Sequence, residues 1–145
     1  MAAVGALAVA AVALAGLFDR AVTRERIAGG GRKVVRVALV DTSVGFDVKP
    51  NTLIVDRGTH LILDVVNDGK ERHDLAVKGG PRRTRMLEPG ESQRLDLGRI
   101  THDTDTWCTV AGHKLFGMSL AIHVTAPVLD ADIAIGDDAH VPSTT

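Results

Sequence analysis

From Lys33 onward, the chain alternates short apolar runs with groups of turn residues. The runs are rich in Val, Ile and Leu, and the breaks between them contain Gly, Pro, Asn and Asp. Short segments of this kind are typical of strands, and no long amphipathic helix pattern interrupts them. We therefore predict strands at residues 33–41, 52–56, 60–66, 74–77, 83–87, 92–97, 105–110 and 118–125. About seven or eight strands at this spacing indicate an all-β fold, an antiparallel sandwich or barrel.

Three connections indicate which of these strands pair. Residues 56–59, Asp-Arg-Gly-Thr, have the composition of a hairpin turn. Residues 88–91, Glu-Pro-Gly-Glu, would join the strands at 83–87 and 92–97 into a further pair. The last pair, 105–110 and 118–125, would be joined by a glycine-bearing loop.

The two ends of the chain differ from this pattern. Residues 2–18 carry no charge and would span about 25 Å as a helix, close to the thickness of a hydrocarbon core. A membrane anchor, a cleaved signal peptide and the end of a longer protein's last span all remain open. We expect a hydrophobic helical segment at 1–19, a linker at 20–32, one folded domain at 33–126 and an acidic flexible tail at 127–145.

Composition narrows the functional class. The 145 residues carry a formal charge of -1, with basic and acidic residues interspersed, so nucleic acid is not an expected partner. The single cysteine cannot form an internal disulfide, but it can ligate a metal.

That cysteine opens the stretch with the clearest chemistry. Cys108 is followed five positions later by His113, and Met118 comes five positions after that. A thiolate, an imidazole and a weak thioether are the donors that suit copper in both oxidation states. Gly112 and Gly117 give the loop the backbone freedom needed to bring the donors together. A fourth ligand has to come from elsewhere.

This Cys-x4-His-x4-Met loop after an aromatic-Cys-Thr strand end resembles the type 1 (blue) copper loop of the cupredoxin family. Family members take another histidine from an upstream loop, and the resemblance therefore implies His73, which follows the Asn-Asp-Gly turn at 67–69. The resemblance to this family covers roughly residues 33–126. It implies a Greek-key cupredoxin β-sandwich and one type 1 copper ion bound by His73, Cys108, His113 and Met118.

The same residues are also compatible with roles that do not involve copper. Zinc is the main competing metal, although structural zinc sites usually use more Cys and His ligands and methionine is a poor zinc ligand. A Cys/His nucleophile pair is a further alternative. A free cysteine or a methionine can also simply fill the core. The remaining histidines, His60, His102, His123 and His140, lie in a strand, a turn, the last strand and the tail, and we expect no ligand among them.

A pair of residues beside the ligands gives a further hypothesis. Many cupredoxins have an Asn after the first histidine that hydrogen-bonds to the Ser or Thr after the cysteine. The matching residues here are Asp74 and Thr109. We predict that Asp74 bridges to Thr109, and that its negative charge, if ionised, stabilises Cu(II) and lowers the reduction potential.

The expected function is electron transfer between redox partner proteins, without catalysis. The resemblance implies that the His113 edge reaches the surface, within an apolar patch formed by Ala111, Leu115 and Phe116. Lys114 could steer an acidic partner. The alternatives are an electron-delivery domain or fragment of a larger copper oxidase or nitrite reductase, and a copper storage or delivery protein.

We expect membrane attachment through residues 2–18 or export, with the copper domain on the extracytoplasmic, periplasmic or extracellular, side. Arg20, Arg24 and Arg26 oppose that orientation, because basic residues tend to stay on the cytoplasmic side of a span.

Overall fold

The computed structural model describes residues 22–126, where the chain forms nine strands and no helix. The prediction of an all-β fold is confirmed for this range. No helix there is long and apolar enough to cross a membrane. The expected hydrophobic segment at 1–19 and the tail at 127–145 lie outside the described residues. The strands are β1 (Arg24–Ile27), β2 (Arg32–Thr42), β3 (Gly45–Lys49), β4 (Thr52–Asp56), β5 (His60–Asn67), β6 (Ala76–Val77), β7 (Ser92–Arg99), β8 (Thr104–Trp107) and β9 (Ser119–Thr125).

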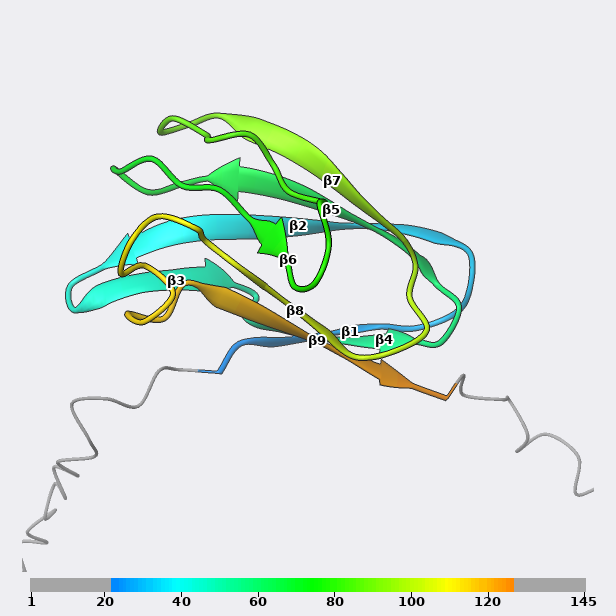
Figure 1. The fold of residues 1–145 in the computed structure, drawn as a ribbon. Coiled ribbons are helices and arrows are strands. Elements are labelled where there is room, and N and C mark those ends of the chain that lie inside the picture. The colour runs from blue at the N-terminus through cyan, green and yellow to red at the C-terminus, as the bar shows by residue number, and fades with distance from the viewer. Residues whose placement is uncertain (1–21, 127–145) are drawn as a thin grey trace, which may run out of the picture.

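The strands form two stacked sheets, and both sheets are mixed (Figure 1). One sheet has the order β1-β4-β9-β8-β6, and the other has the order β3-β2-β5-β7. The prediction of antiparallel sheets is wrong for three pairs, because β1 with β4, β4 with β9 and β2 with β5 run parallel. The apolar pattern of a strand does not show which strand it pairs with or in which direction. The sequence therefore could not distinguish parallel from antiparallel pairs.

The first strand lies inside the range that we expected to be a linker. Residues 24–27 pair in parallel with residues 52–55 of β4, and Ile27 is only 8% exposed in the core. Arg26 also forms a 3.0 Å ion pair with Asp56. This strand escapes detection in the sequence because three of its four residues are charged and only one is apolar.

Two predicted pairings are also wrong. Residues 56–59 do not close a hairpin, because β4 and β5 belong to different sheets. Buried Asp56 instead accepts hydrogen bonds from the Gly29 N–H (2.7 Å) and the Thr125 hydroxyl (3.2 Å). Residues 83–87 form only isolated bridges, and β7 pairs with β5.

The core lies between the sheets and extends to the end where three connections gather. Alternate residues of β2, namely Val35, Val37 and Leu39, are buried, as expected for a strand with one face inward. Cys108 and Met118 belong to the same buried cluster. The β2–β3 turn, the segment after β5 and the loop between β8 and β9 meet at this end, on the left in Figure 1.

Candidate metal centre

Two connections supply the predicted ligands. His73 lies between β5 and β6, whereas Cys108 directly follows β8 and His113 lies in the loop that leads to β9. Backbone hydrogen bonds close this loop: the Cys108 N–H donates to the Met118 carbonyl (3.1 Å), and the Met118 N–H donates to the His113 carbonyl (2.9 Å). Gly112, at a φ of 84°, takes a left-handed conformation that favours glycine.

The structure brings His73, Cys108 and His113 together in one buried group. The His73 Nδ1 lies 3.1 Å from the His113 Nδ1, and the Cys108 Sγ lies 3.9 Å and 3.6 Å from these two nitrogens. A point equidistant from three atoms at these separations lies about 2.1 Å from each, close to the roughly 2.0–2.3 Å of metal bonds to imidazole nitrogen and thiolate sulfur. The donor set therefore fits a single metal ion.

Met118 is fully buried and belongs to the same core cluster as Cys108. Its backbone is tied to both Cys108 and His113 by the hydrogen bonds that close the loop. Its role as the axial ligand stays a prediction.

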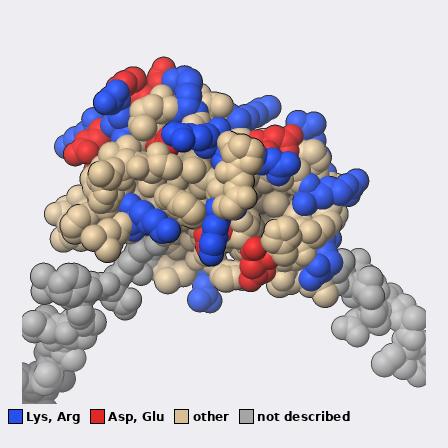
Figure 2. All heavy atoms as spheres, viewed as in Figure 1, with Lys and Arg blue, Asp and Glu red and all other residues tan. Residues whose placement is uncertain are grey.

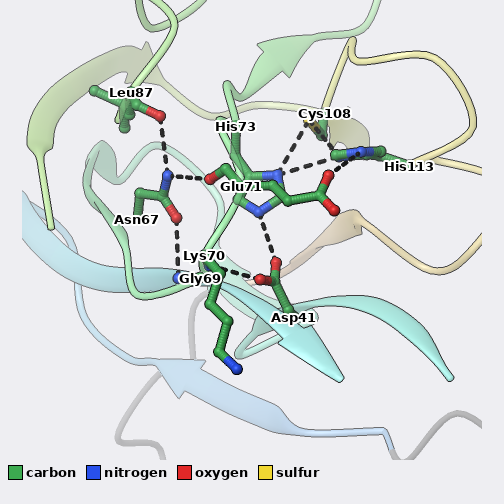
Figure 3. Close-up of polar contacts among 9 residues, drawn as sticks. All are labelled: Asp41, Asn67, Gly69, Lys70, Glu71, His73, Leu87, Cys108 and His113. Carbon is green, nitrogen blue, oxygen red and sulfur yellow. Dashed lines mark hydrogen bonds and ion pairs between the residues drawn. The ribbon is translucent and has the colours of Figure 1, made fainter. Parts of the chain in front are cut away.

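Hydrogen bonds fix the backbone at His73 and the turn before it. His73 and Leu87 exchange N–H to carbonyl bonds of 3.1 and 2.7 Å. The fully buried Asn67 shapes the preceding turn, because its amide group donates to the Glu71 and Leu87 carbonyls and its oxygen accepts from the Gly69 N–H (Figure 3). These contacts explain why the Asn-Asp-Gly turn precedes the histidine.

Each imidazole also has a carboxylate at its second nitrogen (Figure 3). The His73 Nε2 lies 2.9 Å from the Asp41 Oδ1, and the His113 Nε2 lies 3.5 Å from the Glu71 Oε2. Sequence reasoning missed both acids. Glu71 lies only two positions before His73, but Asp41 lies on β2, 32 positions away, and no motif connects it to the histidine.

Phe46 of β3 is a third residue that the sequence reasoning missed. Its ring stacks on the His113 ring, with centroids 3.8 Å apart and planes at 21°, and meets the His73 ring edge-on at 5.6 Å. The Phe46 N–H also donates to the Phe116 carbonyl (3.1 Å), which joins β3 to the ligand loop. Phe46 therefore limits the movement of both imidazole rings.

The predicted bridge between Asp74 and Thr109 is confirmed. The Thr109 N–H and hydroxyl donate to the two Asp74 oxygens at 2.6 and 2.7 Å. Asp74 is fully buried, and Arg83, which the sequence did not indicate, forms a 3.1 Å ion pair with it. One carboxylate thus ties the segment after His73 to the residue after Cys108.

Burial controls the protonation of the metal-free centre. Burial lowers the pKa of His113 below 6.5, and the neighbouring His73 adds to this effect. Burial also raises the pKa of the Cys108 thiol above 9.0. Burial opposes ionisation of Asp41, but hydrogen bonds from the Lys70 N–H and His73 outweigh it, so the pKa of Asp41 is lowered. A metal ion that binds a thiolate must therefore displace the Cys108 proton.

The other described histidines form separate contacts. His60 bonds to Asp96 (2.7 Å), and His123 bonds to Asp103 (3.1 Å). His102 lies 3.2 Å from the Thr101 hydroxyl. His140 lies outside the described residues. Within residues 22–126, the one group of three metal-binding side chains is His73, Cys108 and His113.

The surface beside the centre is apolar. Leu115 (83% exposed) and Phe116 (59%) follow His113 in the same loop, and Val44 (77%) lies in the adjoining β2–β3 turn. His113 itself is only 5% exposed. The Lys114 ammonium lies over the Trp107 ring, 3.9 Å from its centroid. Charged residues are sparse at the lower left of Figure 2, where these loops lie.

Comparisons with known proteins identify the fold. No protein-family model matches the sequence, and no curated protein matches it. Among solved structures, the chain is similar to auracyanin from the photosynthetic bacterium Roseiflexus castenholzii (TM-score 0.51, 16% identity, covering 68% of this chain and 98% of that chain). Auracyanin B gives a TM-score of 0.52 at 20% identity, covering 74% of this chain and 92% of that chain.

A multicopper oxidase is also similar, with a TM-score of 0.54 at 16% identity, covering 66% of this chain and 42% of that chain. The chain thus spans less than half the length of that oxidase. Together, these structures support the cupredoxin-like β fold predicted from the sequence.

Proposed function

We propose that the chain is a type 1 copper electron-transfer protein, with one copper ion held by His73, Cys108, His113 and Met118. The observation that carries this proposal is the buried triangle of two Nδ1 atoms and one Sγ atom, whose size suits a metal ion. Two imidazoles and one thiolate, with a weak axial thioether, form the donor set of blue-copper sites. The similarity of the fold to auracyanins supports the same function.

A zinc site and a nucleophilic cysteine both fit the observed geometry less well than a copper site. Structural zinc sites are closed by four strong ligands, whereas the described part of the chain gathers only three His and Cys donors here. A nucleophilic cysteine needs an accessible thiolate, but Cys108 is 1% exposed and burial raises its pKa.

Bound in this site, copper supplies a one-electron Cu(II)/Cu(I) couple. The protein holds the donors in a packed core, where Phe46, Asn67 and Asp74 restrict their movement. Such a fixed site favours outer-sphere electron transfer. With four protein ligands it offers no position for a substrate, so we propose that the chain by itself is not an enzyme.

Redox partner proteins would dock at the apolar surface formed by Val44, Leu115 and Phe116. This surface lies beside His113, whose ring contacts Phe46. Electrons would enter or leave through this end of the molecule. We also propose an extracytoplasmic location, with attachment to the membrane through residues 2–18.

A second candidate function is electron delivery within a larger copper oxidase or nitrite reductase. The similarity to a multicopper oxidase, of which this chain spans 42%, favours this alternative. The catalytic coppers of such enzymes would need further histidines from outside this chain, since the sequence contains no His-x-His pattern.

The experiment is an absorption and EPR study of the full chain loaded with Cu(II), with Cys108→Ser as the variant. We expect an intense blue colour that disappears reversibly on reduction, and no colour in the variant. A colourless copper-loaded protein would contradict the proposal. Steady oxygen consumption with a reducing substrate would show instead that the chain is an enzyme.

A further inference from the structure

Asp41 is not one of the predicted ligands, but its carboxylate contacts one of them, His73. It lies near the end of β2, and its carboxylate is 22% exposed. One oxygen contacts the His73 Nε2 at 2.9 Å, and the other accepts a 2.5 Å hydrogen bond from the Lys70 N–H. The Lys70 contact holds the carboxylate in place while it faces the imidazole.

The turn before His73 leaves no space for anything between these two groups. A Cβ at Gly69 would lie 2.6 Å from the Asp41 Oδ1 and 2.9 Å from the His73 Nε2. Because real Cβ atoms do not come so close, any other residue would push the carboxylate and the ring apart. The backbone therefore passes so close to the pair that a residue other than glycine would displace one of the two side chains.

We propose that Asp41 is a positioning residue, which holds His73 in the Nε2–H tautomer and so directs the Nδ1 lone pair at copper. The negative charge of Asp41 also favours Cu(II). This inference rests on the proposed copper site. A neutral imidazole has one donor and one acceptor nitrogen, and an ionised carboxylate can only accept. The proton is thus fixed on Nε2, and Nδ1 faces the Cys108 Sγ and the His113 Nδ1.

The two imidazoles are held unequally. His73 is fully buried, and its carboxylate partner lies at 2.9 Å and is only 22% exposed. The contact of His113 with Glu71 is longer, at 3.5 Å, and Glu71 is 62% exposed. Removal of Asp41 should therefore affect the centre far more than removal of Glu71.

The test compares Asp41→Ala and Asp41→Asn with a matched control, Asp68→Asn. Asp68 is an acid near the same turn that pairs with Arg36 at 3.3 Å and is exposed. The measurements are the copper affinity and reduction potential of the full chain, and the 15N shifts of the His73 ring in the metal-free full chain, where no metal fixes the tautomer.

We expect Asp41→Ala to lower copper affinity about 10- to 100-fold, the usual effect of losing such a partner. We also expect a mixture of His73 tautomers in this variant. Asp41→Asn keeps an acceptor oxygen but loses the charge. It should lower the Cu(II) affinity relative to Cu(I) about tenfold, which corresponds to a rise of about 59 mV in the potential of a one-electron couple. Asp68→Asn should match the wild type in all three measurements.

The proposal is overturned if both Asp41 variants match Asp68→Asn. If Asp41→Ala does not fold, Asp41→Asn decides alone, and an unchanged potential refutes the charge effect. A wild-type chain that binds copper without blue colour would refute the copper site itself, which is a separate result.

Discussion

Replacing Asp74 with alanine removes the side chain that ties the two ligand segments together. Its carboxylate accepts two hydrogen bonds from Thr109, at 2.6 and 2.7 Å, and an ion pair from Arg83 at 3.1 Å. Asp74 is fully buried, whereas Arg83 is 56% exposed. The variant should therefore destabilise the metal-free protein as well as the metal site.

The expected loss follows from these contacts. Hydrogen bonds to a charged group contribute about 1.5–3 kcal/mol each, and we use the low end because Thr109 is exposed and water can reach it. The half-exposed Arg83 pair adds well under about 1 kcal/mol. The free energy of unfolding should fall by about 3 kcal/mol in Asp74→Ala. It should fall by only about 1 kcal/mol in Asp74→Asn, whose amide can still bond to Thr109.

Urea denaturation of the metal-free protein, followed by circular dichroism, measures this loss. With an m value of about 2 kcal/mol/M, a loss of about 3 kcal/mol in the free energy of unfolding lowers the urea midpoint by about 1.5 M. The matched control is Asp64→Ala, because Asp64 is 37% exposed and lies 3.9 Å from its partner Arg94. The control should lose less than about 0.5 kcal/mol.

Equal midpoints for Asp74→Ala and Asp64→Ala would refute the reasoning, since the bridge would then contribute nothing to stability. The potential gives an independent result. The negative charge of an ionised Asp74 should favour Cu(II), so an unchanged or lower potential in Asp74→Asn would contradict that electrostatic argument.

Three further predictions concern the centre. The metal-free protein should be most stable between about pH 6.5 and 9.0 in thermal unfolding. Below pH 6.5, His113 takes up a proton in the unfolded state but resists protonation in the folded state. Above pH 9.0, Cys108 loses its proton in the unfolded state but retains it in the folded state. Cys108→Ser should remove the alkaline decline, and a persisting decline would contradict this assignment. Gly69→Ala should cost about 1–3 kcal/mol in denaturant unfolding and weaken copper binding by displacing Asp41, whereas an unchanged copper affinity would argue against the close contact. Met118→Leu should cost less than about 1.5 kcal/mol and raise the reduction potential measured by redox titration, and an unchanged potential would exclude the thioether as a ligand.

The local parts of the protein could be predicted from the sequence. Apolar runs indicated the described strands except β1 and β3, and the spacing of Cys108, His113 and Met118 indicated a loop that carries metal donors. These signals are readable because the residues involved lie close together in the chain. The bridge between Asp74 and Thr109 was predictable too, because the two residues match the Asn and Ser or Thr pair of the cupredoxins that this sequence resembles.

Only the tertiary structure decided which distant segments lie side by side. It made three strand pairs parallel and added β1 beside β4. It also left residues 83–87 with isolated bridges in place of a strand. It also brought Asp41 and Phe46 to the two imidazoles. Strand pairing and packing between sheets depend on how the whole core closes, and that closure leaves no spacing pattern in the sequence. The ligands of the loop are therefore visible in the chain, whereas the groups that orient them are visible only in the fold.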